Sequence, residues 1–189
     1  MPMKRARLPW LAIWVLAGLV AACSPPRIPG LPGSERAVPP PCPPVILIDD
    51  TEELTKFLPG PGRDLIDVVL QAEITGFSGE CETTRERDGS GLVEMTLNVV
   101  FAVTRGPATR DDVGEFTYFV AIIDGRDRIM RKAMFPVAVR FGGNNTIRPN
   151  DTVFQEFELA PGEPGDAYTV IVGFQLTDDQ LRQNRGRGG

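Results

Sequence analysis

The side chains of this chain that could do chemistry are its acids, its two tyrosines and its three cysteines, because its 189 residues include no histidine. Without an imidazole, neither a Ser-His-Asp or Cys-His nucleophile system nor a histidine-ligated zinc or iron site can form. The 25 acidic residues leave carboxylate chemistry open, for example a hydrolase of envelope glycans that uses paired carboxyls. No spacing singles out such a pair. We therefore assign no catalytic residue, no metal ligand and no cofactor.

The first 22 residues have the pattern of a secretory signal peptide. Lys4, Arg5 and Arg7 form a basic start, and residues 8–20 are almost entirely apolar. A helix over that apolar run would rise about 20 Å, whereas the hydrocarbon core of a bilayer is about 30 Å thick and needs roughly 20 residues to cross. A leader that is removed therefore accounts for this segment better than a permanent transmembrane anchor.

The run Val20-Ala21-Ala22-Cys23 resembles the lipobox of bacterial lipoproteins. The resemblance implies that the leader is cleaved before Cys23, that diacylglycerol alkylates the Cys23 thiol, and that the new amine carries an acyl chain such as palmitate. Several acyl chains anchor a protein stably where one does not. Within that family Ser24 at the next position implies release to the outer membrane. The alternative is a buried or disulfide-bonded Cys23 behind an ordinary signal peptide.

Once the lipobox resemblance assigns Cys23 to lipid, Cys42 and Cys81 remain as a pair in an oxidising compartment. We expect them to form a structural disulfide. A redox-active pair is the alternative, but the two cysteines are far from a Cys-x-x-Cys spacing. In the chain-entropy model, closing a loop of this length contributes about 4 kcal/mol to the free energy of unfolding.

The charge balance excludes one class of partner. Removing the leader takes away three of the 20 basic residues and none of the 25 acidic ones, which leaves 17 against 25 and a net charge of −8. Nucleic-acid-binding modules instead carry clustered Lys and Arg. Both tryptophans also leave with the leader, so platforms for stacking sugars or bases are hard to build. We expect no nucleic-acid partner.

The remaining chain divides by composition. Residues 23–44 are rich in proline, which favours an extended tether that holds a domain away from the lipid surface, although a Pro-x-x-Pro recognition segment is a second interpretation. Residues 45–184 are long enough for one domain with a substantial core. We expect residues 185–189, with their glycines and arginines, to form a disordered tail.

Period-two alternation dominates residues 45–184 and predicts about seven or eight β-strands. The most regular stretch runs from Val93 to Val103, and two glycines before Cys81 suggest a bulge or corner. Asp124-Gly125 is a strong hairpin signal. Pro/Gly-rich turns at intervals of about ten residues favour an antiparallel β-sandwich.

Two short helices are expected beside the strands. Thr51–Phe57 has acids in its first turn and Lys56 near its end, as the helix dipole favours, with Asp50 as its cap. We interpret the acids around Asp50 as a solvated turn rather than a calcium site, because EF-hand spacing is missing. Residues 177–184 begin with the capping-box pattern Thr177-x-x-Gln180.

The end of the domain resembles fibronectin type III and other immunoglobulin-like domains. Those domains form a tyrosine corner in which a strand ends, the chain turns at Pro/Gly and a tyrosine opens the next strand. The matching residues in this sequence are Leu159, Pro161, Tyr168, Val170 and Val172. The resemblance implies an immunoglobulin-like sandwich. The chain departs from antibody domains in lacking a core tryptophan, and its cysteines would tie the N-terminal strand instead of crossing the core.

Much of the chain, from Cys42-Pro43-Pro44 to Cys81 and again over Val172–Thr177, also resembles uncharacterised lipoproteins of alphaproteobacteria. That resemblance implies a location and no activity. We expect a non-enzymatic adaptor or accessory module, anchored through its N-terminal lipid at the periplasmic face of the outer membrane, with an envelope protein as its partner. A carrier of a small ligand or metal is the alternative, and a carboxylate-based hydrolase ranks third.

Overall fold

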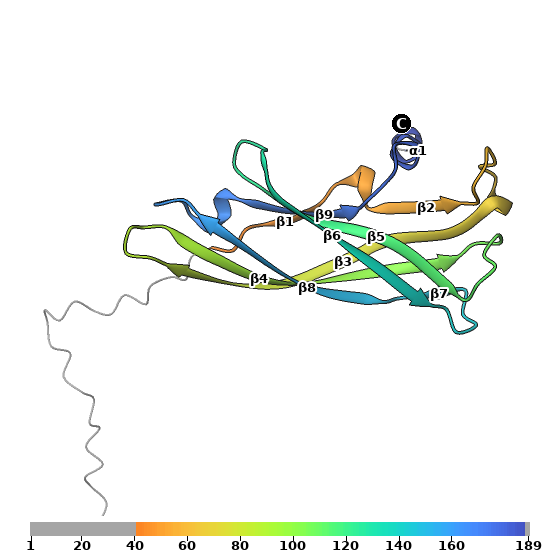
Figure 1. The fold of residues 1–189 in the computed structure, drawn as a ribbon, viewed down its shortest axis with the longest axis horizontal. Helices are drawn as coiled ribbons and strands as arrows, with labels where there is room; N and C mark the ends of the chain where they lie inside the picture. Colours follow the sequence, from red (N-terminus) through yellow and green to blue (C-terminus); the bar gives the residue numbers. More distant parts are fainter. Residues whose placement is uncertain (1–40, 188–189) are drawn as a thin grey trace, which may run out of the picture. The chain divides into compact units, whose positions relative to one another are not determined.

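The strand with the most regular alternation, β4 (Gly91–Arg105), lies inside one of two facing β-sheets (Figure 1). This computed structural model describes residues 41–187, so the predicted leader, Cys23 and most of the predicted tether lie outside the described residues. Every inward position of β4 is almost fully buried, and these positions are Val93, Met95, Leu97, Val99, Phe101 and Val103. The predicted all-β sandwich is confirmed.

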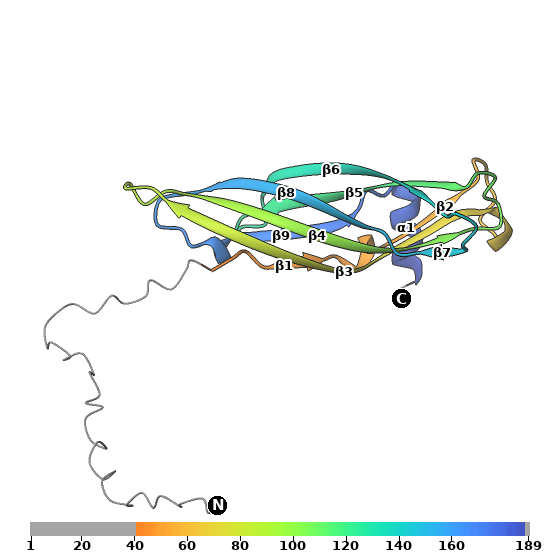
Figure 2. The same cartoon turned by 90° about the horizontal axis from the view of Figure 1, so that it is seen from below.

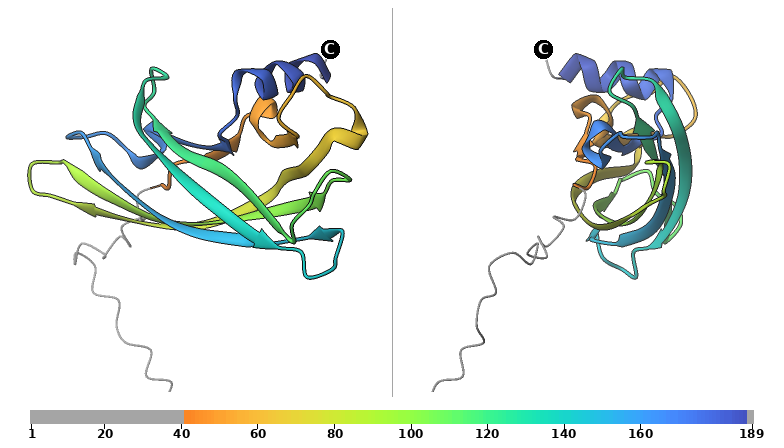
Figure 3. Two further views of the ribbon diagram at one scale, coloured as in Figure 1. Left: turned by 45° about the vertical axis from the view of Figure 1, so that its right-hand side comes forward. Right: turned by 90° about the vertical axis from the view of Figure 1, so that its left-hand side faces the viewer.

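The described strands form two sheets, and the sheet that contains β1 is called the first sheet. The first sheet has the order β1 (Val45–Leu47), β9 (Thr169–Phe174), β5 (Val113–Ile123) and β6 (Ile129–Arg140). The second sheet has the order β2 (Glu53–Phe57), β3 (Val68–Arg85) and β4, and β4 also pairs with β8 (Asn150–Leu159) and the short β7 (Thr146–Ile147). The strands of the two sheets cross at an angle (Figures 2 and 3).

The remaining elements are short. They are the 3₁₀ turns η1 (Asp49–Thr51), η2 (Leu65–Asp67) and η3 (Gly165–Ala167), and the helix α1 (Asp178–Arg187). Within residues 41–187, no helix has the length and apolar character that crossing a membrane requires.

The strand order is that of an immunoglobulin-like sandwich, with one replacement and with β2 added beside β3. The order β3-β4-β8 corresponds to strands A-B-E, and β6-β5-β9 corresponds to C′-C-F. The position beside F, where an immunoglobulin domain has its antiparallel G strand, is taken by β1, which pairs in parallel with β9. The chain can leave β9 directly for α1 because the N-terminal strand completes the first sheet.

The predicted tyrosine corner is present where the chain crosses from β8 to β9. Leu159 ends β8 and Tyr168 immediately precedes β9, and both are buried. The Tyr168 hydroxyl donates to Glu163 Oε2 at 2.6 Å, so a side chain accepts the bond that a backbone group takes in immunoglobulin domains. The corner fixes how the chain passes from one sheet to the other.

The predicted helix over residues 51–57 is wrong. The segment makes one 3₁₀ turn and then continues as β2, whose residues pair antiparallel with β3 from Glu53↔Glu73 to Lys56↔Leu70. Its acids and its lysine fit a helix dipole, but the segment has no apolar stripe at helical spacing, and pairing with β3 buries Leu54. Tertiary pairing outweighs such a weak helical preference.

The second predicted helix is confirmed and is longer than expected. The Thr177 Oγ1 accepts from the Gln180 N–H at 3.3 Å and Gln180 Oε1 accepts from the Thr177 N–H at 2.8 Å, which is the predicted capping box. The helix runs on to Arg187, so the expectation of a disordered tail from residue 185 is wrong for the described part of that tail. Arg185 is held there because its Nε donates to Asp50 Oδ2 at 2.7 Å.

Candidate functional site

The disulfide between Cys42 and Cys81 is present, as the sequence predicts. Cys42 lies just before β1 of the first sheet, and Cys81 lies in the second half of β3, beyond the part that β2 covers. The bond therefore joins the two sheets along one open side of the sandwich. The adjacent Pro43 is buried, so the described end of the tether packs against the domain.

The edge of β2 is covered by α1, which lies over η1 and β2 (Figure 3). The helix reaches β2 with side-chain amides. Gln180 Nε2 donates to the Thr55 carbonyl oxygen at 3.3 Å, and Asn184 Nδ2 donates to the carbonyl oxygens of Glu53 and Asp50 at 2.8 and 2.9 Å. These three acceptors are backbone atoms of the strand edge and of the turn before it.

The register of β2 explains why those carbonyls are accessible. The Glu52 carbonyl accepts from the Ile74 N–H at 2.9 Å, so it points toward β3. Backbone groups alternate in direction along a strand, so Glu53 and Thr55 point theirs away from β3. No other strand of the described part pairs with this side of β2. Amides of α1 therefore occupy acceptors that a neighbouring strand would otherwise use.

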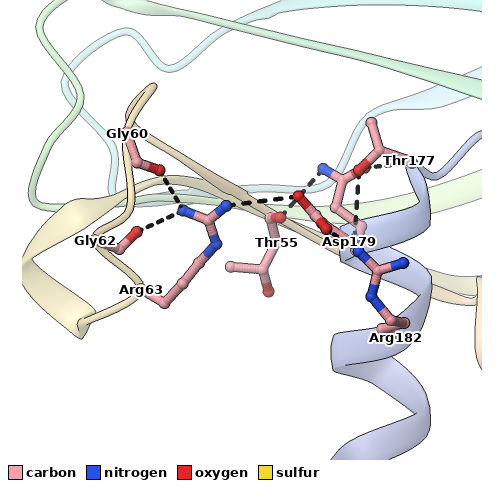
Figure 4. A network of polar contacts seen from close by, with 8 residues as sticks. Thr55, Gly60, Gly62, Arg63, Thr177, Asp179 and Arg182 are labelled. Atoms are coloured by element: carbon pink, nitrogen blue, oxygen red, sulfur yellow. Dashed lines mark hydrogen bonds and ion pairs between the residues drawn. The ribbon is translucent and has the colours of Figure 1, made fainter.

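Ion pairs hold the start of α1 to the loop between β2 and β3 (Figure 4). Arg63 donates from Nη1 to the carbonyl oxygens of Gly60 and Gly62 at 2.8 and 2.7 Å, and its Nη2 lies 3.9 Å from Asp179 Oδ2. Asp179 also pairs with Arg182, one turn further along the helix. All of these charges are exposed, and exposed ion pairs contribute little to stability.

A groove of about 910 Å³ lies beside this covered edge. It runs over β5 and β6 of the first sheet to β2 and the first turn of α1. Its lining mixes apolar and polar side chains, namely Leu54, Lys56, Glu115, Phe116, Thr117, Met134, Pro136, Val137, Ala138, Gln175, Thr177 and Gln180. Lys56 Nζ spans it and donates to the Glu115 carbonyl oxygen at 3.0 Å. Met134 is 62% exposed, so the groove presents apolar surface to solvent.

The pKa values of the described carboxyls bear on the alternative of a carboxylate-based hydrolase. Two carboxyls have clearly shifted pKa values, and both shifts are downward, whereas a general acid needs a raised pKa. Hydrogen bonds from Arg128 lower the pKa of Asp124 to about 2, and hydrogen bonds from Ser90 lower the pKa of Asp88. Among residues 41–187, no three Cys, Asp or Glu side chains are grouped so that they could hold a metal ion.

Sequence reasoning found Gln180 as a capping residue but missed the second role of its amide and missed Asn184 entirely. An available signal was the spacing of the two amides, which stand four residues apart and so lie on one helix face. That spacing could not point to β2 while residues 51–57 were interpreted as a helix. The structure thus brings together one cluster from two segments that the sequence places more than a hundred residues apart.

The fold and this cluster together define an all-β sandwich that has a covered strand edge and a surface groove. No protein-family model matches the chain, and no curated protein matches it. A solved structure that matches is the variable (V) domain of the Streptococcus agalactiae AgI/II polypeptide BspA, at 10% sequence identity. The match covers 69% of this chain and 75% of that domain, with a TM-score of 0.20. A likeness at that level carries no inference about this chain.

Proposed function

We propose that this chain is a lipid-anchored lipoprotein of the bacterial cell envelope that acts as a non-enzymatic adaptor. Cys23 carries the lipid, residues 23–44 tether the domain, and the sandwich binds an envelope protein at the periplasmic face of the outer membrane. The leader and lipobox patterns and the resemblance to alphaproteobacterial lipoproteins support the anchor.

The observation that carries the adaptor role is the groove over β5 and β6. Met134 and Pro136 of β6 both line it; Met134 is 62% exposed, and Pro136 is also exposed. Adjacent exposed apolar side chains that line a groove are typical of surfaces that bind other proteins. Methionine suits such a surface because its flexible, polarisable side chain adapts to a partner.

The packed interior supports this role over that of a small-ligand carrier. The inward side chains of β4 and β9 are almost fully buried, and Phe101 of β4 contacts Phe116 and Tyr118 of β5 at ring-centroid distances of 5.1 and 5.2 Å. A small-ligand site is concave and buries most of the ligand's surface. The groove over β5 and β6 lies at the surface, where an extended protein segment fits better than an enclosed ligand.

Site-specific photo-crosslinking in the native host tests the adaptor role. We expect a photo-reactive phenylalanine analogue in place of Met134 to give a discrete crosslinked protein. The matched control is the same analogue in place of Phe154, which is 56% exposed on the outer face of β8 in the second sheet. Equal products from both positions, or none from position 134, would contradict an adaptor that binds through the groove.

Mass spectrometry of the mature N-terminal peptide tests the anchor. The expected species begins at Cys23 and carries a diacylglyceryl group and an acyl chain, and Cys23→Ser should release the domain from the membrane fraction. The variant Ser24→Asp should move the protein to the inner membrane. An unmodified N-terminal peptide in mature protein from the native host would overturn the lipoprotein assignment.

A further inference from the structure

The helix α1 has few apolar side chains that could hold it against the sandwich. In Asp178–Arg187 the single large apolar side chain is Leu181, and the other positions are acids, amides, arginines and a glycine. A helix that is polar on all sides needs specific partners to remain docked. Its partners are the β2 edge, the loop at Arg63 and Asp50, and all of them are polar.

The side-chain amides of α1 bind the β2 edge with the spacing that the backbone of a neighbouring strand would have. Residues four apart on a helix rise about 6 Å, and residues two apart on a strand rise about 6.6 Å. The amides of Gln180 and Asn184 are four apart, and the carbonyls of Thr55 and Glu53 that accept from them are two apart. The amide N–H groups therefore stand where the backbone N–H groups of an added strand would stand.

Charge complementarity indicates what kind of strand would fit. Asp50 Oδ2 accepts from Arg185 Nε at 2.7 Å, so the present cover supplies a cation to this end of the edge. Without α1 that carboxylate would lose its cation, in a stretch where Asp49 and Glu53 are already exposed and Glu52 is half-buried. A replacement must bring basic side chains of its own.

The groove indicates the second requirement. Leu54 and Lys56 of β2 line it, and so does Gln180 of α1, so the groove is continuous with the covered edge. A strand added to β2 would point alternate side chains toward this groove, where Leu54, Phe116 and Met134 offer apolar contacts. Backbone pairing supplies affinity in such additions and the alternate side chains supply selectivity.

We propose that the edge of β2 that faces away from β3 is a strand-addition site for an extended segment of a partner protein with alternating basic and apolar residues, and that α1 is its displaceable cover. The proposal deepens the adaptor function and rests on it. Binding exchanges the three amide hydrogen bonds of Gln180 and Asn184 for backbone hydrogen bonds from the partner, and it exchanges Arg185 for a basic residue of the partner. The basic residues of α1 are then free to face solvent.

The first experiment weakens the binding of α1 to the β2 edge in the full chain, without changing the size of any side chain. In the double variant Gln180→Glu and Asn184→Asp the N–H donors to β2 become carboxylate oxygens, while Glu at position 180 still completes the capping box. The control is Asn150→Asp, which removes a comparable amide hydrogen bond to Asn98 Oδ1 at 2.8 Å on the second sheet. We expect faster hydrogen exchange of α1 amides in the double variant and unchanged exchange in the control.

The second experiment measures binding of labelled probe peptides by fluorescence anisotropy. A short peptide of alternating arginine and valine should bind the double variant at least about tenfold more tightly than the wild type, a gain of about 1.4 kcal/mol. A glutamate–valine peptide should not bind. Methylating one set of alternate backbone nitrogens should abolish binding, and methylating the other set should not, because only one set faces β2.

The proposal fails if the arginine–valine peptide does not bind the double variant, if it binds wild type and variant equally, or if both methylated peptides bind as well as the parent. These outcomes leave the adaptor function separately testable. Crosslinking from position 134 together with failed peptide binding would retain an adaptor that uses only the groove. Peptide binding together with failed crosslinking would show a strand-addition site on a chain that lacks the proposed envelope partner.

Discussion

Each of the two tyrosine hydroxyls in the chain donates to a carboxylate. Tyr118 of β5 donates to Asp151 Oδ2 on β8 at 2.9 Å and so connects the two sheets, and Tyr168 donates to Glu163 Oε2 at 2.6 Å. Burial raises the pKa of both phenols, and the neighbouring carboxylates raise it further because they repel a phenolate. Both tyrosines therefore act as structural hydrogen-bond donors that must stay protonated.

These raised pKa values predict a sharp alkaline response. A folded-state pKa above the unfolded value of about 10 stabilises the fold fully below that pH, and the contribution declines as the pH rises above it. Ultraviolet titration of the folded chain should therefore show little tyrosinate near pH 10, and tyrosinate should appear together with the loss of circular dichroism. The variant Tyr118→Phe should keep the delayed ionisation of Tyr168. An early, full tyrosinate step in a chain that remains folded would contradict the prediction.

At the scale of elements, the N-terminal strand shows how a sandwich manages without a conventional last strand. β1 has only three residues, yet Val45 and Leu47 pack against the core, and the strand pairs in parallel with β9. Such a short strand is marginal by itself. The Cys42–Cys81 bond ties the start of β1 to the opposite sheet and limits the conformations open to this segment when the domain unfolds.

The disulfide should account for a large share of the stability. The double variant Cys42→Ser and Cys81→Ser opens a loop with a sequence separation of 39 residues. We expect the free energy of unfolding, measured by urea titration, to fall by about 4 kcal/mol. Reduction of the wild type should produce a similar loss, which serves as the control. A loss below about 1 kcal/mol would mean that the unfolded chain is already restricted in this region or that β1 holds without the bond.

At the scale of the whole domain, an aromatic cluster joins the two sheets. Phe101 from β4 meets Phe116 and Tyr118 from β5 and Phe174 from β9, with ring centroids 5.1, 5.2 and 6.0 Å apart. Edge-on and tilted contacts of this kind contribute beyond the area that they bury. The cluster occupies the space between the sheets where a ligand would otherwise have to fit.

Truncating the centre of this cluster should weaken the whole domain. Phe101→Ala leaves a cavity at a fully buried position, and we expect it to lower the free energy of unfolding by about 3–5 kcal/mol. Phe154→Ala, at a position that is 56% exposed, should change it by at most about 0.5 kcal/mol. Urea titrations of both variants check the prediction, and comparable effects at the two positions would show that Phe101 does not hold the sheets together.

Prediction from the sequence succeeded where the pattern within one segment carries enough information. The alternation of Val93–Val103, the tyrosine corner at Tyr168 and the capping box of Thr177 and Gln180 all follow from local spacing, and all are present. The bulge expected before Cys81 is also present, as a register shift between Ile74 and Gly76. Each of these features depends on residues that lie close together in the chain.

Prediction failed where distant segments decide the outcome. Residues 51–57 have a sequence that suits either a weak helix or a strand. They form a strand because they can pair with the edge of β3 that β4 leaves open. The parallel pairing of β1 with β9 and the docking of Asn184 on β2 each join segments more than a hundred residues apart. No local pattern records such contacts, because their free energy comes from groups that meet only after the sheets have formed.

The sequence by itself therefore determined the fold class, the cysteine pairing expected of Cys42 and Cys81, and the choice between inward and outward faces of the long strands, because period-two burial is a property of single strands. The tertiary structure alone decided which strand edges are paired and which are covered. Every non-proline residue carries the same backbone donor and acceptor, so the alternation within one strand does not indicate which edge pairs with which. The edge of β2 is covered by α1 because no strand of the described part pairs with it.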